Sequence, residues 1–239
     1  MSAKLSENTS RPPSTLVEGA GRFLDHARGA TVTRCLVESP GLELLERECF
    51  LSADECAAVR RHIDAAKSGP AYVFEREAYV VRERHRRTLL ADVEPSVAAA
   101  ITEKLSAVRP LLEVHFGVTL STCAGPEFLK YVPGDRFRPH SDTVENDSVP
   151  SEVRRREISV IIFFNDQIPS DNAPSYAGGE LVFYRDPALS TWATARVPIA
   201  PATGTLLAFR SKTLHEVREV SAGSRYTAVT WFYRGEHLA

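Results

Sequence analysis

The chain has 239 residues, of which 43% are hydrophobic and 25% charged, and its formal net charge is −2. This composition predicts a globular, soluble protein with an ordinary core, and so weak a net charge gives no general attraction to nucleic acid. The longest apolar run, residues 158–164 broken by Ser159, is far shorter than the roughly 18 residues of a membrane-spanning helix, so no membrane partner is expected. The composition leaves the oligomeric state open.

The first 47 residues are predicted to form an N-terminal extension. The opening MSAKLSENTSRPPS lacks the apolar segment of a secretory signal, and its serines, prolines and charges indicate a partly disordered tail. We therefore expect a cytoplasmic protein. Its four cysteines show no CxxC spacing and are interpreted as reduced thiols of the core.

Two helices are predicted in the first half of the chain. Ser52 and Glu55 have the spacing of a capping box, and apolar residues recur at helical spacing behind them, which predicts a helix over about residues 53–67. A second helix is expected over residues 95–116, because proline suits its first turn. Pro110 should bend or divide this helix.

The remaining segments favour strands. Residues 72–90 mix β-branched and aromatic side chains with charges, which suits one or two exposed strands. From Thr119 onward, short β-like runs are separated by Gly, Pro, Asn and Asp, which predicts an α+β protein with a sandwich or jelly-roll core and the helices on one outer face. The predicted strands are residues 127–132, 157–164, 180–184, 195–199, 205–209, 216–220 and 225–233.

A metal site is predicted from three side chains. His140 and Asp142 have the same parity, so on an extended segment both leave the same face and can reach one ion. His215 follows the apolar strand GTLLAF and joins them if the sheet rolls up. Two neutral imidazoles and one carboxylate form the facial triad of non-haem Fe(II) oxygenases, with zinc as a competing metal. The histidines interpreted as structural are His26, His62, His85, His115 and His237.

A buried charge is predicted at the start of the last strand. Alternation places Arg225 on the same face as Thr227, Val229 and Trp231, and the apolar residues of this face indicate that it points inward. A guanidinium directed into a barrel is costly unless an anion meets it. We therefore expect Arg225 to bind a carboxylate.

The order of these motifs resembles the iron(II)/2-oxoglutarate-dependent dioxygenases of the prolyl 4-hydroxylase-like family. HSD is followed by GGELVFY, GTLLAF, His215 and GSRYTAVTW, and the helix entrance ECFLSADEC is similar to the opening of the same catalytic domain. The resemblance covers about Glu48 to Arg234. It implies a double-stranded β-helix core of about residues 119–235 within a dioxygenase domain of residues 48–239.

The resemblance also implies roles for individual residues. Arg225 matches the residue that binds the distal carboxylate of 2-oxoglutarate, and Tyr131 and Thr227 are expected to contribute hydroxyl groups to the same cosubstrate. Phe163 stands where many relatives carry a tyrosine that also bonds this carboxylate, which leaves more of the task to Arg225. The implied cofactors are Fe(II), 2-oxoglutarate and O2, with ascorbate as an auxiliary ligand. The implied catalytic iron ligands are His140, Asp142 and His215.

The implied activity is hydroxylation of an unactivated C–H bond with release of succinate and CO2. The expected substrate is a prolyl or other residue in a polypeptide, the alternative is a free amino acid or another small metabolite, and a noncatalytic cupin-like binding module is a third interpretation. The polar segment Thr143 to Glu157 is a candidate lid. The basic runs at residues 82–87 and 154–156 could attract a negatively charged substrate, but they are interpreted as solvated, because glutamates interrupt or flank them.

Overall fold

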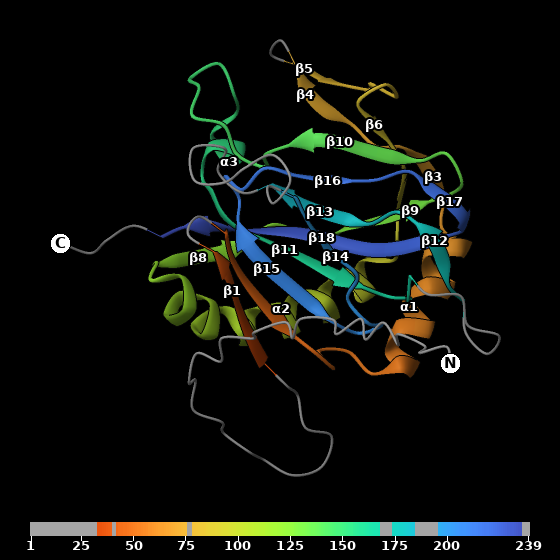
Figure 1. Cartoon of the computed structure of the whole chain (residues 1–239), viewed down its shortest axis with the longest axis horizontal. Helices are drawn as coiled ribbons and strands as arrows, with labels where there is room; N and C mark the ends of the chain where they lie inside the picture. Colours follow the sequence, from red (N-terminus) through yellow and green to blue (C-terminus); the bar gives the residue numbers. More distant parts are fainter. Residues whose placement is uncertain (1–32, 40–41, 76–77, 168–173, 185–195, 236–239) are drawn as a thin grey trace, which may run out of the picture.

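Two antiparallel β-sheets face each other in the computed structural model, and two helices cover the outer side of the larger sheet (Figure 1). The structure describes residues 33–39, 42–75, 78–167, 174–184 and 196–235. Successive strands alternate between the sheets, since β9 and β11 lie in the larger sheet and β10 lies between them in the smaller one. This winding is the predicted double-stranded β-helix, and the fold class is confirmed.

The larger sheet has nine strands in the order β1-β2-β15-β11-β18-β9-β7-β3, with β8 paired to β18. Its strands are β1 (Thr33–Ser39), β2 (Leu42–Arg47), β3 (Ser68–Pro70), β7 (Leu89–Ala91), β8 (Leu120–Cys123), β9 (Glu127–Tyr131), β11 (Arg156–Phe163), β15 (Leu206–Arg210) and β18 (Arg225–Arg234).

The smaller sheet has five strands in the order β14-β13-β16-β10-β6, and two short ribbons, β4 with β5 and β12 with β17, flank the sandwich. In Figure 1 the ribbon of β4 and β5 stands at the top, beyond β10. These strands are β4 (Val73–Glu75), β5 (Ala78–Val80), β6 (Arg86–Arg87), β10 (Arg136–His140), β12 (Tyr176–Gly178), β13 (Leu181–Tyr184), β14 (Arg196–Ile199), β16 (His215–Val217) and β17 (Val220–Gly223).

The helices are α1 (Ala53–Ala65), α2 (Pro95–Phe116) and the single turn α3 (Ser151–Arg154). The capping box of α1 is formed, because the Ser52 hydroxyl accepts from the Glu55 N–H and the Glu55 carboxylate accepts from the Ser52 N–H. Helix α2 runs through Pro110 without being divided. Pro110 is on the exposed face, where water can bond the freed carbonyl. Among the described residues, no helix is long and apolar enough to cross a membrane.

The core has two layers, one on each face of the larger sheet. Along β11, Ile158, Val160 and Ile162 pack against the helices, whereas Ile161 and Phe163 pack between the sheets. A strand that is buried on both faces needs apolar residues at nearly every position, which explains the apolar run of residues 158–163, interrupted only by Ser159. Helices and sheets are thus joined through one central strand.

The predicted N-terminal extension contributes to this core. Residues 42–47 form β2, which pairs with β15, and Leu44 and Leu45 are fully buried, one in each layer. Residues 1–32 lie outside the described part of the chain. Of the cysteines expected in the core, Cys56 is buried and Cys123 is half-buried, but Cys49 is exposed.

Two glycines provide a matched test of local backbone strain. Gly117 (φ +62°) and Gly204 (φ +81°) both have left-handed backbones, but an added Cβ meets nothing at Gly117 and presses on the Leu51 carbonyl at Gly204. Gly117→Ala should therefore cost about 1–2 kcal/mol of unfolding free energy, the penalty of the left-handed conformation alone. Gly204→Ala should cost clearly more. Urea unfolding measures both, and equal losses would contradict the packing at Gly204.

Candidate active site

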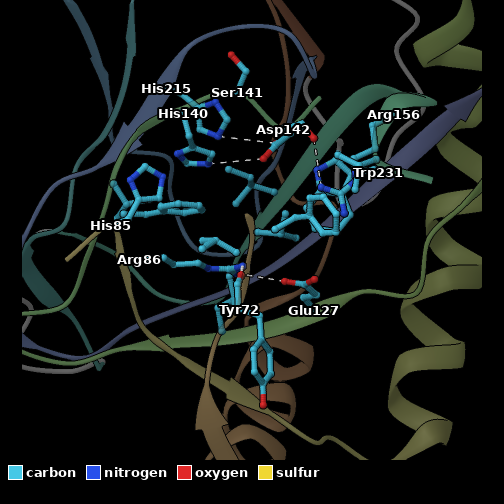
Figure 2. Close-up of a pocket in the computed structure, with 18 of the residues that line it drawn as sticks. Tyr72, His85, Arg86, Glu127, His140, Ser141, Asp142, Arg156, His215 and Trp231 are labelled. Carbon is cyan, nitrogen blue, oxygen red and sulfur yellow. Dashed lines mark hydrogen bonds and ion pairs between the residues drawn. The ribbon is translucent and has the colours of Figure 1, made fainter. Parts of the chain in front are cut away.

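A pocket of about 210 Å³ opens between the two sheets. Side chains of β9, β10, β11, β16 and β18 line it, and so do Phe74 of β4 and Tyr79 of β5. Figure 2 shows the labelled residues of this lining. All six residues predicted to bind iron or cosubstrate line this one pocket. They are Tyr131, His140, Asp142, His215, Arg225 and Thr227.

Two neighbouring strands and the loop after one of them assemble the predicted metal ligands. His140 ends β10 and His215 begins β16, and the two residues are direct partners in the antiparallel pairing of these strands. The Nε2 atom of His140 lies 3.6 Å from Oδ1 of Asp142, and the Nε2 atom of His215 lies 3.8 Å from Oδ2. One ligand atom from each residue lies within 4.8 Å of the others. The three side chains therefore converge on a space that one ion can fill.

Hydrogen bonds to the backbone fix the orientation of both imidazoles. Nδ1 of His140 is 2.8 Å from the Arg138 carbonyl, and Nδ1 of His215 is 2.9 Å from the Thr213 carbonyl. Because a carbonyl oxygen only accepts, each Nδ1 carries a proton, and the neutral form of each ring then has its lone pair on Nε2. Both lone pairs are directed toward Asp142, as a divalent metal requires.

The electrostatics of the triad favour the protonation states that bind metal. Burial lowers the pKa of His215 to about 4, with a further contribution from His140, so its imidazole is neutral at neutral pH. Burial alone would raise the pKa of Asp142, but the two imidazoles and the Ser159 hydroxyl outweigh it and hold this pKa well below its usual range. A carboxylate beside a neutral imidazole is thus present before any ion binds.

Arg225 is the largest side chain in the fully buried core, with 1% of its surface exposed. Its guanidinium lies between the rings of Tyr131 and Phe163, 5.2 Å from each centroid, and Nη1 donates to the Thr227 hydroxyl at 3.3 Å. Nε and Nη2 are buried without a hydrogen-bond partner, and no carboxylate of the described residues pairs with the charge. Such a group calls for an anionic ligand.

The aromatic and hydroxyl groups around Arg225 complete the base of the pocket. Tyr131 faces Arg225 across the pairing of β9 and β18 and is 2% exposed. Burial raises the pKa of Tyr131, so its phenol stays protonated and can donate a hydrogen bond. Phe163 offers only a ring face, which leaves Thr227 as the hydroxyl in contact with the guanidinium.

Arginines from both basic runs line the pocket, contrary to the prediction that these runs are solvated. Arg86 donates to Glu127 at 3.2 Å. Arg156 donates to the backbone carbonyl of Asp142 at 3.2 Å and lies 3.6 Å over the Trp231 ring (Figure 2). A register shift in β11 between residues 156 and 158 breaks the alternation there. Periodicity therefore gave no signal that Arg156 points inward.

Stacked rings support one of the imidazoles. The Phe137 ring lies on His140 at a centroid distance of 3.5 Å and an interplanar angle of 17°. His85, which was predicted to be only structural, lines the pocket and meets the edge of Phe137 at 5.5 Å. Residues 72–90 were predicted to form one or two exposed strands, which gave no indication of this arrangement. The segment is divided among four short strands, of which β4 pairs with β5, β6 with β10, and β7 with β3 and β9.

The candidate lid covers part of the mouth. Residues 143–157 include α3, and their apolar side chains Val144, Val149 and Val153 line the pocket. Val144 is 50% exposed, so it can lose water to a bound substrate. The segment is in the right place for a lid, and its movement stays a prediction.

Comparisons with known proteins agree with this geometry. Residues 126–233 match the model of the 2OG-Fe(II) oxygenase superfamily. The chain is similar to PKHD-type hydroxylases of Caulobacter sp. (strain K31) and Stenotrophomonas maltophilia (strain R551-3), each with 27% identity over 190 residues, 79% of this chain and 77% of the relative.

Solved structures share the fold. A Pseudomonas putida prolyl-4-hydroxylase superposes with a TM-score of 0.60 at 22% identity, covering 81% of this chain and 93% of the other. A Trichoplax adhaerens prolyl hydroxylase, solved with a hypoxia inducible factor peptide fragment, has a TM-score of 0.59 at 19% identity, covering 80% and 83% of the two chains.

The fold and the site define a non-haem iron oxygenase. Over residues 126–233 the chain matches the 2OG-Fe(II) oxygenase superfamily, and it is an enzyme of the hydroxylase class with a prolyl 4-hydroxylase-like fold. Its cofactors are Fe(II), 2-oxoglutarate and O2. The site fits these cofactors. The converging triad offers three ligands to a divalent cation, and the unpartnered guanidinium of Arg225 can meet the anionic cosubstrate.

The unpaired charge of Arg225 has a consequence for stability. Arg225→Met removes a buried cation without breaking an ion pair, so the thermal midpoint of the cosubstrate-free protein should stay equal or rise. The wild type should gain stability with 2-oxoglutarate and Mn(II), and the variant should not. The control Arg210→Met breaks a pair with Glu43 at 2.9 Å and should lower the midpoint. A marked loss in Arg225→Met, with the 2-oxoglutarate response retained, would contradict the anchor.

Proposed function

We propose that this enzyme hydroxylates an unactivated C–H bond with Fe(II) held by His140, Asp142 and His215, and that it releases succinate and CO2. The observation that carries the proposal is the pairing, in one pocket, of a convergent triad with a buried guanidinium that has no anion. A noncatalytic cupin-like module has no need for that unpaired charge, whose burial is costly.

The anchor of the cosubstrate is proposed to be Arg225. Its free Nε and Nη2 groups can form charge-assisted hydrogen bonds with the distal carboxylate of 2-oxoglutarate. Thr227 supplies the hydroxyl that Phe163 lacks, and Tyr131 contributes a phenol from the opposite strand. These contacts orient the cosubstrate with its keto acid toward the triad.

The chain's own contribution to the reaction is orientation and exclusion of water. When bound, the iron couples the oxidation of 2-oxoglutarate by O2 to hydroxylation of the substrate. The neutral imidazole of His215, the imidazole of His140 and the ionised Asp142 would hold the metal on one side, so the other side would stay accessible from the pocket. Leu129, Ile161 and Val229 give the pocket apolar walls that limit unproductive water.

We propose a residue in a polypeptide, prolyl or other, as the substrate. Tyr72 and Tyr79 line the mouth of the pocket while being 51% and 54% exposed, which provides aromatic surface for an extended chain outside the reacting residue. The Trichoplax adhaerens hydroxylase of similar fold was solved with a peptide fragment. These observations support a peptide without identifying its sequence.

The alternative substrate is a free amino acid or another small metabolite. Arg156 favours it, because its guanidinium lines the pocket beside Asp142 and has no carboxylate partner among the described residues. A free carboxylate would provide that partner, whereas a peptide would offer a neutral carbonyl.

The proposal extends to the whole domain. We place the dioxygenase domain at residues 48–239, with β2 added to its larger sheet. A cytoplasmic location and ascorbate as an auxiliary ligand complete the proposal, with ascorbate acting to keep the iron reduced.

Replacing the metal ligands tests the assignment. His140→Ala, Asp142→Ala and His215→Ala should each lower iron-dependent succinate formation by more than about 100-fold, because a ligand contributes at least as much as its supporting contacts. The matched control is His62→Gln, which changes an exposed histidine of α1 and should keep full activity. Undiminished succinate formation in any of the three variants would refute the triad.

A paired substrate screen tests the substrate class. Each candidate amino acid is offered free and as the central residue of a blocked tripeptide, and stimulated succinate formation and a +16 Da product are measured. The peptide proposal predicts stimulation by blocked peptides alone. Stimulation by the free amino acids alone would establish the alternative, and Arg156→Gln should then abolish it while Arg155→Gln does not.

A further inference from the structure

Two serines lie behind the carboxylate of the triad in the buried core. Ser159 is in the middle of β11, and Ser211 directly follows β15. Both are 0% exposed. Ser159 interrupts an otherwise apolar strand on the side that faces the other sheet, where its neighbours Ile161 and Phe163 are buried hydrophobic residues. A hydroxyl placed there costs free energy unless it is bonded.

Both hydroxyls are used in a chain that ends at Asp142. Oγ of Ser159 lies 2.7 Å from Oδ2 of Asp142 and 2.9 Å from Oγ of Ser211. A hydroxyl has one proton, and the ionised carboxylate can only accept, so the Ser159 proton goes to Asp142. Ser211 must then donate to Ser159. Each bond in such a chain polarises the next, which strengthens the bond to the charged oxygen.

Ser211 also holds the backbone of the same ligand. Its carbonyl accepts the N–H of Asp142 at 2.9 Å and the N–H of Thr143 at 3.3 Å, and its own N–H donates to the Glu157 carbonyl at 3.0 Å. Ser211 therefore holds Asp142 in two ways. Its carbonyl binds the main chain of Asp142 directly, and its hydroxyl acts on the side chain of Asp142 through Ser159. Each imidazole, in contrast, has one orienting hydrogen bond, to the carbonyl two residues before it.

We propose that Ser159 and Ser211 form a positioning pair that makes Asp142 bind the metal through one oxygen. With Oδ2 held by the serines, Oδ1 is left for the ion, beside Nε2 of His140. Without the pair, the carboxylate can turn and offer both oxygens, which would take a coordination position needed by the cosubstrate or O2. This inference rests on the proposed metal site.

The test is Mn(II) binding to the full-length, metal-free protein by calorimetry. Ser159→Ala should weaken Mn(II) binding about 10- to 100-fold, the usual effect of losing a partner that orients a ligand. Ser211→Ala should weaken it less, because Ser159 can still donate to Asp142. Ser159→Thr keeps a hydroxyl and should restore binding. The visible spectrum of bound Co(II) should change in Ser159→Ala, because the number of ligand oxygens changes.

A buried hydroxyl elsewhere in the same sheet is the matched control. Thr230 is 1% exposed and donates to the Ala124 carbonyl at 2.7 Å, away from the pocket. Thr230→Val should lower the unfolding midpoint and leave Mn(II) binding unchanged. If Ser159→Ala does not fold, Ser159→Cys carries the test, since a thiol is a weak donor of similar size.

The outcomes separate this inference from the proposed function. A wild-type protein that binds no Mn(II) and forms no succinate would refute the metal site itself. If the wild type binds Mn(II) and forms succinate, and Ser159→Ala has the same Mn(II) affinity and Co(II) spectrum as the wild type, only the positioning pair is refuted.

Discussion

The structure depends on a positive charge that the fold buries and does not neutralise. Arg225 lies between two aromatic rings at the base of the pocket, and two of its nitrogens have no partner. The stacking holds the guanidinium in place but supplies no counter-ion. Burying a charge in this way is unfavourable for the isolated chain. It becomes favourable once a carboxylate binds, so affinity for an anion is built into the fold.

The two sheets have different tasks in this site. The larger sheet provides the anchor, with Arg225 on β18 and Tyr131 on β9, whereas the smaller sheet provides His140 on β10 and His215 on β16. In the proposed binding mode, a dicarboxylate cosubstrate bridges the sheets, with one end on each. Asp142 lies in the loop after β10, and its N–H bonds to the carbonyl of Ser211, the residue that follows β15 of the larger sheet. The spacing between metal and anchor is thus set by the sandwich itself.

Much of this could be predicted from local patterns, and the failures have definite physical causes. The strand-like runs predicted a jelly-roll core, and parity placed His140 with Asp142 and turned Arg225 inward. The resemblance to the dioxygenases implied the β-helix and the remaining site residues, and all six predicted residues do share one pocket. Arg156 was missed because a register shift reverses its side, and β2 because its pairing with β15 is distant in sequence. The hydrogen bond from Ser159 to Asp142 was missed because these two residues are also distant in sequence. Contacts between distant segments leave no periodic signal in either one.

The central claim is that the cosubstrate spans iron and Arg225, and an anaerobic titration tests it most directly. Fe(II)-loaded enzyme is titrated with 2-oxoglutarate and with 2-oxovalerate, which has the same chain length but no distal carboxylate, while the weak visible charge-transfer band is followed. The account predicts that the band saturates at a concentration of 2-oxoglutarate about 10- to 150-fold lower than the concentration of 2-oxovalerate that is needed. This ratio corresponds to the free energy of one charge-assisted hydrogen-bonded pair. Equal saturation by both acids, or no band in the folded protein, would contradict it.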